Sequence, residues 1–362
     1  MRTLVVGGGL TGAALVRLLQ DARQAAAYAS DVVVWDRNSI AGGRVMGRSF
    51  PKQRDVHVDM GAQYWTPRSD QNDEFRQKLL QSGHLRTFAE QEIAQDPYRS
   101  AVKTHFVCPK GKGFRGMVEH LLDGVETCLL TEVESFDVLD EKHIKVRTTK
   151  GKEEVVNELV LTCPIPNVMA ILKKSMSSQV NSQTLQALEN VTYSQRFAAA
   201  YLFNEETADE VQKMGWTARY VAPHESEIIR FVCWDHLKKK ANGKSQPALI
   251  VHTSVPFGAT FMDDIRPNDE ILSLITKSLR EVLPTLPTEL DARLHRWRIS
   301  QVMEPYHDPT SANEDESPAA VVLSTHPRII VAGDGFQGSN FDSCLLSAKA
   351  AVQLLQDPKS GL

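Results

Sequence analysis

The N-terminal part of the chain alternates between strand-like and helix-like hydrophobic patterns. Leu4-Val5-Val6 is a short apolar run of the kind that forms a buried strand. Apolar residues then recur on one face of a predicted helix, at Ala14, Leu15, Leu18 and Leu19. A second apolar run, Asp31–Trp35, predicts another strand. The order strand, helix, strand is typical of half of a parallel α/β sheet.

The same pattern returns at the other end of the chain. Arg328–Ala332 predicts a buried strand, and a helical pattern begins near Ser343. The apolar face of that helix is formed by Leu345, Leu346, Ala348, Ala351, Val352 and Leu355. Each end of the chain therefore combines a buried strand with a helix, as the repeating units of a parallel α/β sheet do. We expect both ends to contribute strands to one sheet, in a single, discontinuous domain.

The middle of the chain has a different organisation. Residues 144–149 and 154–161 predict a hairpin, and residues 158–162 predict a strand that ends at Cys163-Pro164. From about residue 191 to 302 we expect mixed strands and one clear helix, with Asn268 as its N-cap and an end at Pro284. The buried stripe of this helix is Ile271, Leu272, Ile275, Leu279 and Val282.

Composition excludes several classes of protein. The chain has 362 residues, which suggests about two domains, and its 42% hydrophobic and 24% charged residues are typical of a folded soluble protein. A net charge of -4 gives no support to nucleic-acid binding. The longest apolar runs, such as residues 197–203, are far shorter than the roughly 20 residues of a membrane span.

The cysteines and histidines predict neither a disulfide framework nor a metal site. The 5 cysteines form no C-x-x-C pair, and the 11 histidines show no short ligand spacing. A reducing compartment fits best, so we expect a cytoplasmic protein. The apolar stretch 4–16 after Arg2 has some features of a secretory signal, but three glycines and Thr11 interrupt it.

The first glycine motif predicts a dinucleotide site. Gly7, Gly9 and Gly12 form G-x-G-x-x-G between a predicted strand and a predicted helix. These glycines allow a tight turn, the approach of a pyrophosphate, and close packing of helix on strand. Asp36 ends the next strand, 24 residues beyond Gly12, where a carboxylate is expected to bind the ribose hydroxyls. The alternative, a glycine turn with a solvated acid, explains fewer of these features.

A second glycine pair shifts the expected cofactor from NAD to FAD. Ala41-Gly42-Gly43-Arg44 resembles the G-G-R signature of the flavin-containing amine oxidase superfamily, in which the arginine helps to neutralise the pyrophosphate. Near the C-terminus, Gly333-Asp334 follows a strand and precedes a helix. Asp334 can accept hydrogen bonds from ribityl hydroxyls, and the helix N-terminus favours a reduced, anionic flavin edge. The alternative is an Asp-Gly turn whose helix is capped by Asp342 or Ser343.

Four further stretches together resemble the renalase family. They are Gly61-Ala62-Gln63-Tyr64, residues 251–258, residues 297–302, and residues 333–342. The resemblance runs from residue 4 to about residue 355. It departs from the family at Val45-Met46-Gly47, at residues 175–184 and at residues 308–317.

The resemblance implies a fold and a domain division. The fold class is α/β, a Rossmann-type FAD-binding domain like that of p-hydroxybenzoate hydroxylase, with an interleaved α+β substrate domain. The FAD-binding domain would comprise residues 1–70, 106–190 and 310–362, and the substrate domain residues 71–105 and 191–309. The cofactor would be noncovalent FAD, because no cysteine lies in a flavin-attachment motif.

The resemblance also implies an activity. The family oxidises 2- and 6-dihydro-NAD(P) to NAD(P)+ by hydride transfer to flavin, with O2 reduced to H2O2. The partners would be this dihydronicotinamide dinucleotide and O2, with no nucleic acid and no membrane; the oligomeric state has no sequence signal. A flavin amine oxidase and a non-catalytic flavin-binding signalling protein remain alternatives.

The candidate site residues fall into two groups. The residues expected to bind cofactor are Gly7, Gly9, Thr11, Gly12, Asp36, Arg37, Gly43, Arg44, Gly61, Ala62, Gln63, Tyr64, Gly333, Asp334, Asn340 and Phe341. The candidate catalytic residues are His252, Trp297 and Asn340. His252 alternates with an apolar set on its strand and would face the flavin cavity, although a structural histidine fits the pattern equally well. A core tryptophan is the common alternative for Trp297.

The distribution of lysines along the chain argues against amine oxidation. Amine oxidases of this superfamily often place a lysine near the flavin, but residues 175–212 and 278–348 contain none. A dihydronicotinamide needs no strong base, because hydride loss itself creates an aromatic ring. Lys238-Lys239-Lys240 with Lys244 is expected to be a solvated loop, and Glu314-Asp315-Glu316 a surface loop.

Overall fold

The structure is a computed structural model that describes residues 1–24, 28, 30–97, 104–175, 180–239, 246–311 and 317–356. The predicted loop residues Lys240, Lys244 and Glu314-Asp315-Glu316 lie outside the described residues. The chain forms two compact units. Unit 1 comprises Met1–Arg44, Val118–Tyr193 and Gln301–Leu362, and unit 2 comprises Val45–Met117 and Ser194–Ser300.

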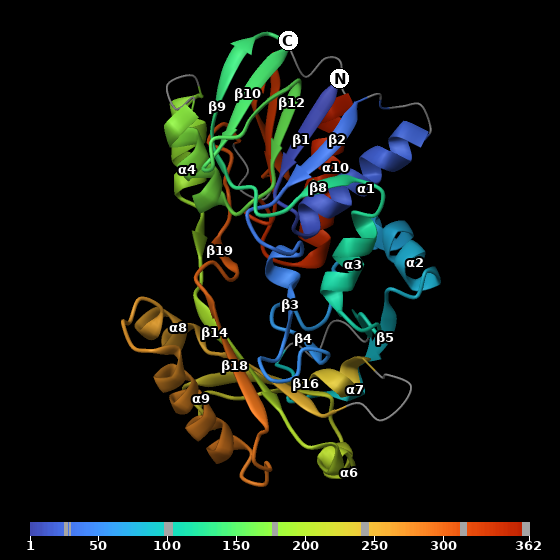
Figure 1. Ribbon diagram of the computed structural model, residues 1–362, viewed down its shortest axis with the longest axis vertical. Coiled ribbons are helices and arrows are strands. Elements are labelled where there is room, and N and C mark those ends of the chain that lie inside the picture. Colours follow the sequence, from blue (N-terminus) through green and yellow to red (C-terminus); the bar gives the residue numbers. More distant parts are fainter. Residues whose placement is uncertain are drawn as a thin grey trace. The chain divides into compact units, whose positions relative to one another are not determined.

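Unit 1 is built on a six-stranded sheet that joins both ends of the chain (Figure 1). In spatial order its strands are β20 (Ala320–Thr325), β21 (Arg328–Ala332), β12 (Glu158–Leu161), β1 (Arg2–Val6), β2 (Asp31–Trp35) and β8 (Glu126–Cys128). All pairs are parallel except β20 with β21. The helices α1 (Leu10–Gln24) and α10 (Phe341–Gln356) pack against each other. The sequence therefore predicted β1, β2, β12 and β21 of this sheet and the helices α1 and α10 correctly.

A second, three-stranded sheet lies within unit 1. It contains β9 (Val133–Asp140), β10 (His143–Thr148) and β11 (Glu153–Val156), and its core continues into α4 (Ile165–Ser175) and α5 (Ser182–Glu189). The run predicted at 154–161 is broken at Asn157, because this residue donates to and accepts from the backbone of Arg2. The first half therefore forms the hairpin, and the second half enters the six-stranded sheet.

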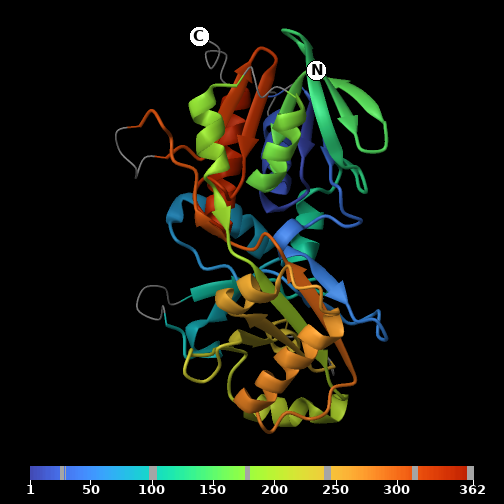
Figure 2. The ribbon, with the colours of Figure 1, turned by 90° about the vertical axis from the view of Figure 1, so that its left-hand side faces the viewer.

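Unit 2 contains a six-stranded, mostly antiparallel sheet. In spatial order its strands are β18 (Asp291–Trp297), β14 (Arg196–Leu202), β17 (Ala248–Thr253), β16 (Ile229–Trp234), β15 (Ala218–Tyr220) and β6 (Ile93–Ala94). One face is covered by α8 (Val255–Phe261) and α9 (Asn268–Val282), which cross the strands in Figure 2. Asn268 is the first residue of α9 and not its N-cap, which is Pro267. The side-chain Oδ1 of Asn268 accepts from Arg296 Nε at 2.9 Å and so is not used to cap the helix.

The other face of this sheet is covered by two antiparallel strand pairs, β3 (Gly47–Ser49) with β4 (His57–Asp59) and β5 (Arg86–Ala89) with β7 (Thr104–Val107). Phe50, Val58 and Met60 pack there against Ala198 and Ile250. This packing is why residues 45–70 belong to unit 2, whereas the division implied by the family resemblance placed them in the cofactor domain.

Shorter elements complete the fold. They are η1 (Gly43–Val45), η2 (Asp70–Asn72), α2 (Asp73–Gln81), η3 (Glu90–Glu92), α3 (Phe114–Leu121), β13 (Thr192–Tyr193), η4 (Glu205–Thr207), α6 (Ala208–Lys213), α7 (Asp235–Lys239) and β19 (Val302–Glu304). Among the described residues, no helix combines the length and the apolar character that crossing a bilayer requires.

Candidate functional site

The turn between β1 and α1 has the shape of a phosphate cradle. An ideal Cβ on Gly12 would lie 2.0 Å from the Gly7 carbonyl oxygen and 2.8 Å from Thr162 Oγ1, so no larger residue fits. An ideal Cβ on Gly9 would meet only the Cα of Gly43, at 4.0 Å, which leaves its other side open. The amides at the start of α1 have no acceptors within the helix. The turn therefore fits a pyrophosphate.

Asp36 lies beside this turn, at the end of β2. Its Oδ2 accepts from Gly8 N at 2.8 Å, and its Oδ1 accepts from the backbone and side chain of Asn38 at 2.8 and 2.9 Å. Backbone amides thus fix the carboxylate, and its remaining lone pairs suit ribose hydroxyls. Arg37, which the sequence also assigned to the cofactor, is half exposed and lies 3.8 Å from Glu132.

The second glycine pair packs directly on the first. Gly42 N donates to Gly8 O at 2.8 Å, and an ideal Cβ on Gly43 would lie 3.3 Å from the Cα of Gly9. The close approach of two backbones explains why both motifs need glycine here. Together, these residues can hold the adenosine diphosphate half of FAD.

Arg44 and Asp334 come from opposite ends of the chain and form a bidentate ion pair. Arg44 Nη1 and Nη2 lie 2.6 and 2.5 Å from the two carboxylate oxygens. Burial lowers the pKa of Arg44, but Asp334 more than offsets this, so the pKa is raised and the guanidinium stays charged. Ser339 Oγ also donates to Asp334. The two predicted cofactor ligands therefore order each other, which fits a site for phosphate and ribityl groups.

Asn340 caps α10, and not Asp342 or Ser343, which the alternative interpretation of this turn would have used. Its Oδ1 accepts from Ser343 N at 2.9 Å, and its Nδ2 donates to Ser343 Oγ at 2.7 Å. Both ends of the side chain thus have partners within the helix terminus. Phe341 and Thr11 are buried nearby in α10 and α1, and Gly333 N donates to Ser347 Oγ at 2.7 Å.

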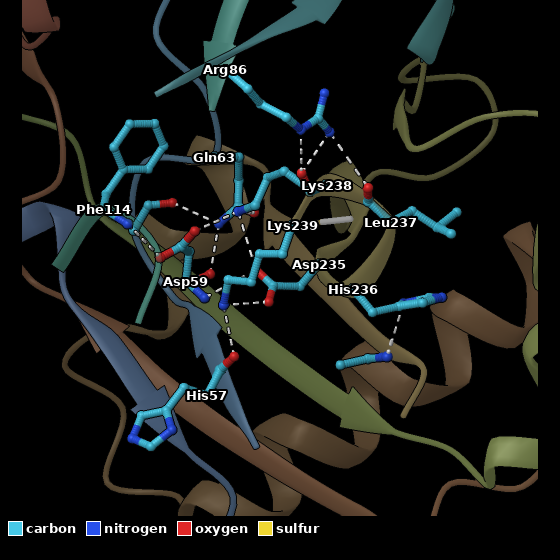
Figure 3. Close-up of polar contacts among 12 residues, drawn as sticks. His57, Asp59, Gln63, Arg86, Phe114, Asp235, His236, Leu237, Lys238 and Lys239 are labelled. Carbon is cyan, nitrogen blue, oxygen red and sulfur yellow. Dashed lines mark hydrogen bonds and ion pairs between the residues drawn. The ribbon is translucent and has the colours of Figure 1, made fainter. Parts of the chain in front are cut away.

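In unit 2, a buried charge network holds the segment that begins at Asp59 (Figure 3). Lys238 Nζ lies 2.6 Å from Asp59 Oδ2 and 3.1 Å from both Asp235 Oδ1 and Gln63 Oε1. Gln63 Nε2 donates to the carbonyl oxygens of Asp59 and Gly61, at 2.6 and 2.9 Å. The Gln63 amide therefore binds the backbone of its own segment, and these hydrogen bonds fix the conformation of Gly61 and Ala62.

Lys238 and Lys239 are 0% and 6% exposed, so the prediction of a solvated loop was wrong for them. They lie on α7 with Asp235, and Lys239 Nζ is 2.6 Å from Asp235 Oδ2 and 2.7 Å from His57 O. Burial raises the pKa of Asp235, but Lys239 and Lys238 lower it to about 2. The spacing of Asp235 three and four residues before the lysines was the signal that could have revealed this helix.

The two carboxylates keep Lys238 charged. Burial alone would lower its pKa, but Asp59 and Asp235 raise it above the ordinary value. Arg86 Nη2 donates to the Lys238 carbonyl oxygen at 2.6 Å and so satisfies the end of α7. Lys238 is thus a protonated structural cation and has no lone pair with which to accept a proton.

His252 and Trp297 share the sheet face that the Asp59 segment covers. Both lie opposite β14 residues on that face, and Trp297 Nε1 donates to Met60 O at 3.0 Å. Burial and then Arg196 lower the pKa of His252 to about 4, so its ring is neutral. Its Nε2 is buried and has no hydrogen-bond partner among the described residues. The structure therefore brings two of the three predicted catalytic residues, His252 and Trp297, to one face and leaves one ring nitrogen of His252 available, whereas Asn340 lies at the start of α10 in unit 1.

Aromatic side chains continue this face. The Tyr64 hydroxyl lies 2.5 Å from that of Tyr220, and the Tyr64 ring meets the His105 ring edge-on with centroids 5.1 Å apart. Phe231 lies 5.9 Å from the His252 ring. Burial raises the pKa of Tyr64, so its hydroxyl stays protonated. Sequence reasoning missed Tyr220 and Phe231, which reach the site only through strand pairing.

No group of three His, Cys, Asp or Glu side chains in the described ranges could hold a metal ion.

Two family models match the sequence. The model described as flavin containing amine oxidoreductase matches residues 75–356, and that described as NAD(P)-binding Rossmann-like domain matches residues 5–81. The chain is 28% identical to renalase of Mus musculus over 363 residues, with 98% of each protein covered. These matches confirm the resemblance predicted from the sequence motifs.

Solved structures show the same fold. A putative protoporphyrinogen oxidase from Exiguobacterium has a TM-score of 0.68 at 12% identity, with 98% of both chains covered. Putrescine oxidase, in a structure with bound putrescine, has a TM-score of 0.67 at 12% identity, with 98% of this chain and 99% of that chain covered. The prediction of an α/β flavoprotein fold is confirmed.

Proposed function

The chain belongs to the flavin containing amine oxidoreductase family, and on that premise we propose that it is an FAD-dependent oxidase of isomeric dihydronicotinamides. The substrates would be 2- and 6-dihydro-NAD(P), which lose a hydride to become NAD(P)+. Bound flavin would take the electron pair and pass it to O2, which becomes H2O2 with uptake of a proton.

Unit 1 would hold FAD noncovalently. The turn with Gly9 and Gly12 suits the pyrophosphate, and Asp36 suits the adenosine ribose. The ordered Arg44–Asp334 pair offers a cation for phosphate and an acceptor for ribityl hydroxyls. None of these contacts needs a covalent bond, so denaturation should release free FAD.

The low basicity of His252 is the observation that favours a dihydronicotinamide over an amine as the substrate. A primary amine resembles lysine, whose pKa is about 10.4, so it must lose a proton before it can lose a hydride. An imidazole with a pKa of about 4 is a weak base for that task. A dihydronicotinamide carries no such proton, and hydride loss restores aromaticity without a base.

The remaining groups of the face support the same substrate. Lys238 is protonated and held by two carboxylates, so it is not a substitute base. Trp297 is anchored to Met60 O and presents a flat surface against which a nicotinamide ring can lie. His252 Nε2 can accept from or donate to the carboxamide of that ring.

Anaerobic mixing tests the proposal. The FAD-loaded protein is mixed with 2-dihydro-NAD, 6-dihydro-NAD, ordinary 4-dihydro-NAD, a polyamine and a catecholamine, and the oxidised-flavin absorbance is followed. We expect bleaching within seconds with the first two donors, and H2O2 equal to the NAD+ formed once air is admitted. Bleaching by an amine alone would establish the amine oxidase alternative. No bleaching by any donor would favour a non-catalytic flavin protein.

A further inference from the structure

Thr162 follows β12 and lies between the two turns of unit 1 that carry the glycine motifs. β12 pairs in parallel with β1, which leads into Gly7, and with β21, which leads into Gly333. An ideal Cβ on Gly7 would lie 2.9 Å from Thr162 Oγ1, and one on Gly12 would lie 2.8 Å from the same atom. Both glycines therefore leave room for this hydroxyl, to which the sequence motifs assign no role.

The Thr162 hydroxyl donates to the backbone of the first turn. Its Oγ1 lies 2.9 Å from Gly7 O and 3.1 Å from Val6 O, so one hydrogen is shared between two carbonyl oxygens. The backbone N of Thr162 also donates to Val6 O, at 2.9 Å, so that oxygen keeps a partner without the hydroxyl. The distinct contribution of the hydroxyl is therefore its bond to Gly7 O.

The peptide group that joins Gly7 to Gly8 is held at both of its polar ends. Its carbonyl oxygen accepts from Thr162 Oγ1, and its N–H donates to Asp36 Oδ2 at 2.8 Å. In a trans peptide these two groups point in opposite directions, so the direction of one fixes the direction of the other. The Thr162 hydroxyl therefore determines how this N–H meets the Asp36 carboxylate, although the two side chains follow different strands.

Asp36 depends on this peptide for its position relative to the glycine turn. Its other oxygen, Oδ1, accepts from the backbone and side chain of Asn38, two residues along the chain, and these bonds hold the carboxylate to its own loop. The bond from Gly8 N ties the same carboxylate to the turn, and an ideal Cβ on Gly8 would lie 3.3 Å from Asp36 Oδ2. A rotation of the peptide would therefore displace the carboxylate from the turn.

We propose that Thr162 is a positioning residue for recognition of the adenosine ribose. It acts through the Gly7–Gly8 peptide on the Asp36 carboxylate and does not itself touch the ligand. Without the hydroxyl, the peptide loses one of its two anchors, and the remaining lone pairs of Asp36 no longer match the ribose hydroxyls. This inference rests on the proposed function, because it takes unit 1 as the FAD site, but it does not depend on which donor reduces the flavin.

The test uses ADP and 2′-deoxy-ADP, which differ in one ribose hydroxyl, as calorimetric probes of the full-length apoprotein. A hydroxyl bound by a carboxylate makes a charge-assisted hydrogen bond, so the wild type should bind ADP about 10- to 100-fold more tightly than 2′-deoxy-ADP. In Thr162→Val, which keeps the shape and removes the donor, this preference should fall by about three- to tenfold. Thr162→Ser keeps the hydroxyl and should retain the preference.

Two further variants complete the test. Thr162→Ala removes the same donor without placing a methyl group against Gly7 O, so it gives the same comparison if the valine variant does not fold. Thr276→Val is the matched control, because Thr276 is also half-buried and donates to a backbone carbonyl oxygen, that of Leu272 in α9 of unit 2, at 2.8 Å. Thr276→Val should keep the wild-type preference for ADP.

Two outcomes would overturn the inference. If Thr162→Val weakened both ligands equally and kept their ratio, the hydroxyl would support the turn without positioning Asp36. If the wild type bound ADP and 2′-deoxy-ADP alike, Asp36 would not recognise the ribose, and Thr162 could not act through it. Neither probe is a reductant, so a failure of dihydronicotinamides as donors would leave this result unaffected.

Discussion

The cradle of unit 1 and the charge network of unit 2 both shape a short segment of backbone, but they do so by different means. In unit 1, Gly12 lies against Gly7 and Gly42 N binds Gly8 O, so the shape comes from the absence of side chains. In unit 2, the segment after Asp59 is held by a lysine that lies far along the chain. The first construction depends on local sequence, whereas the second depends on the whole sheet being formed.

The cradle should be the more sensitive of the two to a single methyl group. Gly12→Ala would place Cβ 2.0 Å from a carbonyl oxygen, so the turn must open and the site for the pyrophosphate is lost. We expect purified Gly12→Ala to contain essentially no FAD, measured by flavin absorbance per protein. Gly111→Ala, where nothing lies within 4 Å, is the control and should keep its flavin. Full occupancy in Gly12→Ala would refute this account of the turn.

Removing the lysine of the charge network in unit 2 should lower the free energy of unfolding. Lys238→Met would leave Asp59 and Asp235 buried without their shared cation, and breaking such a pair costs about 3–5 kcal/mol. Urea unfolding should show this loss, while Lys277→Met, at an exposed position of α9, should stay within about 0.5 kcal/mol of wild type. If the two variants unfolded alike, the network would not be what holds the segment.

The difference between the glycine cradle and the charge network also explains which features could be predicted from the sequence. The glycine motifs, both ends of the six-stranded sheet and the position of Asp334 between a strand and a helix follow from residues that are close in sequence. The ion pair between Asp334 and Arg44 was not predicted, because it joins opposite ends of the chain. Lys238 could not be placed, because three successive lysines read as solvated charge unless the position of Asp59 is known. The aromatic face with Tyr220 was hidden for the same reason, since strand register is set by tertiary packing.

The Arg44–Asp334 pair combines both constructions, because it joins a glycine motif to a distant side chain. Asp334→Ala would remove an acceptor for ribityl hydroxyls and leave Arg44 without its partner. Charge-assisted hydrogen bonds contribute about 1.5–3 kcal/mol, so FAD should bind about 10- to 100-fold more weakly. Titration of the apoprotein with FAD measures this, with Asp140→Ala at an exposed turn as the control. Unchanged affinity would remove Asp334 from the cofactor site.

The smallest effect should be that of pH on stability, through protonation of two buried histidines in unit 2. His252 and His295 have pKa values lowered to about 4 by burial first, and then by Arg196 and by Arg48 respectively. In the unfolded chain a histidine has a pKa of about 6.5, so between these values the unfolded state binds more protons. Their contribution to stability is therefore complete above pH 6.5 and is lost as the pH falls toward 4.

The double variant H252N/H295N separates this contribution from general acid unfolding. Asparagine cannot gain a proton, so the thermal midpoint of the variant should fall less steeply than that of the wild type between pH 6.5 and 4. At roughly 2–4 °C per kcal/mol, the difference is a matter of a few degrees. His224→Asn, at an exposed position of unit 2, is the control and should keep the wild-type slope. Coincident slopes for the double variant and the wild type would mean that these rings are solvated, and the argument that His252 is too weak a base for an amine would fall with them.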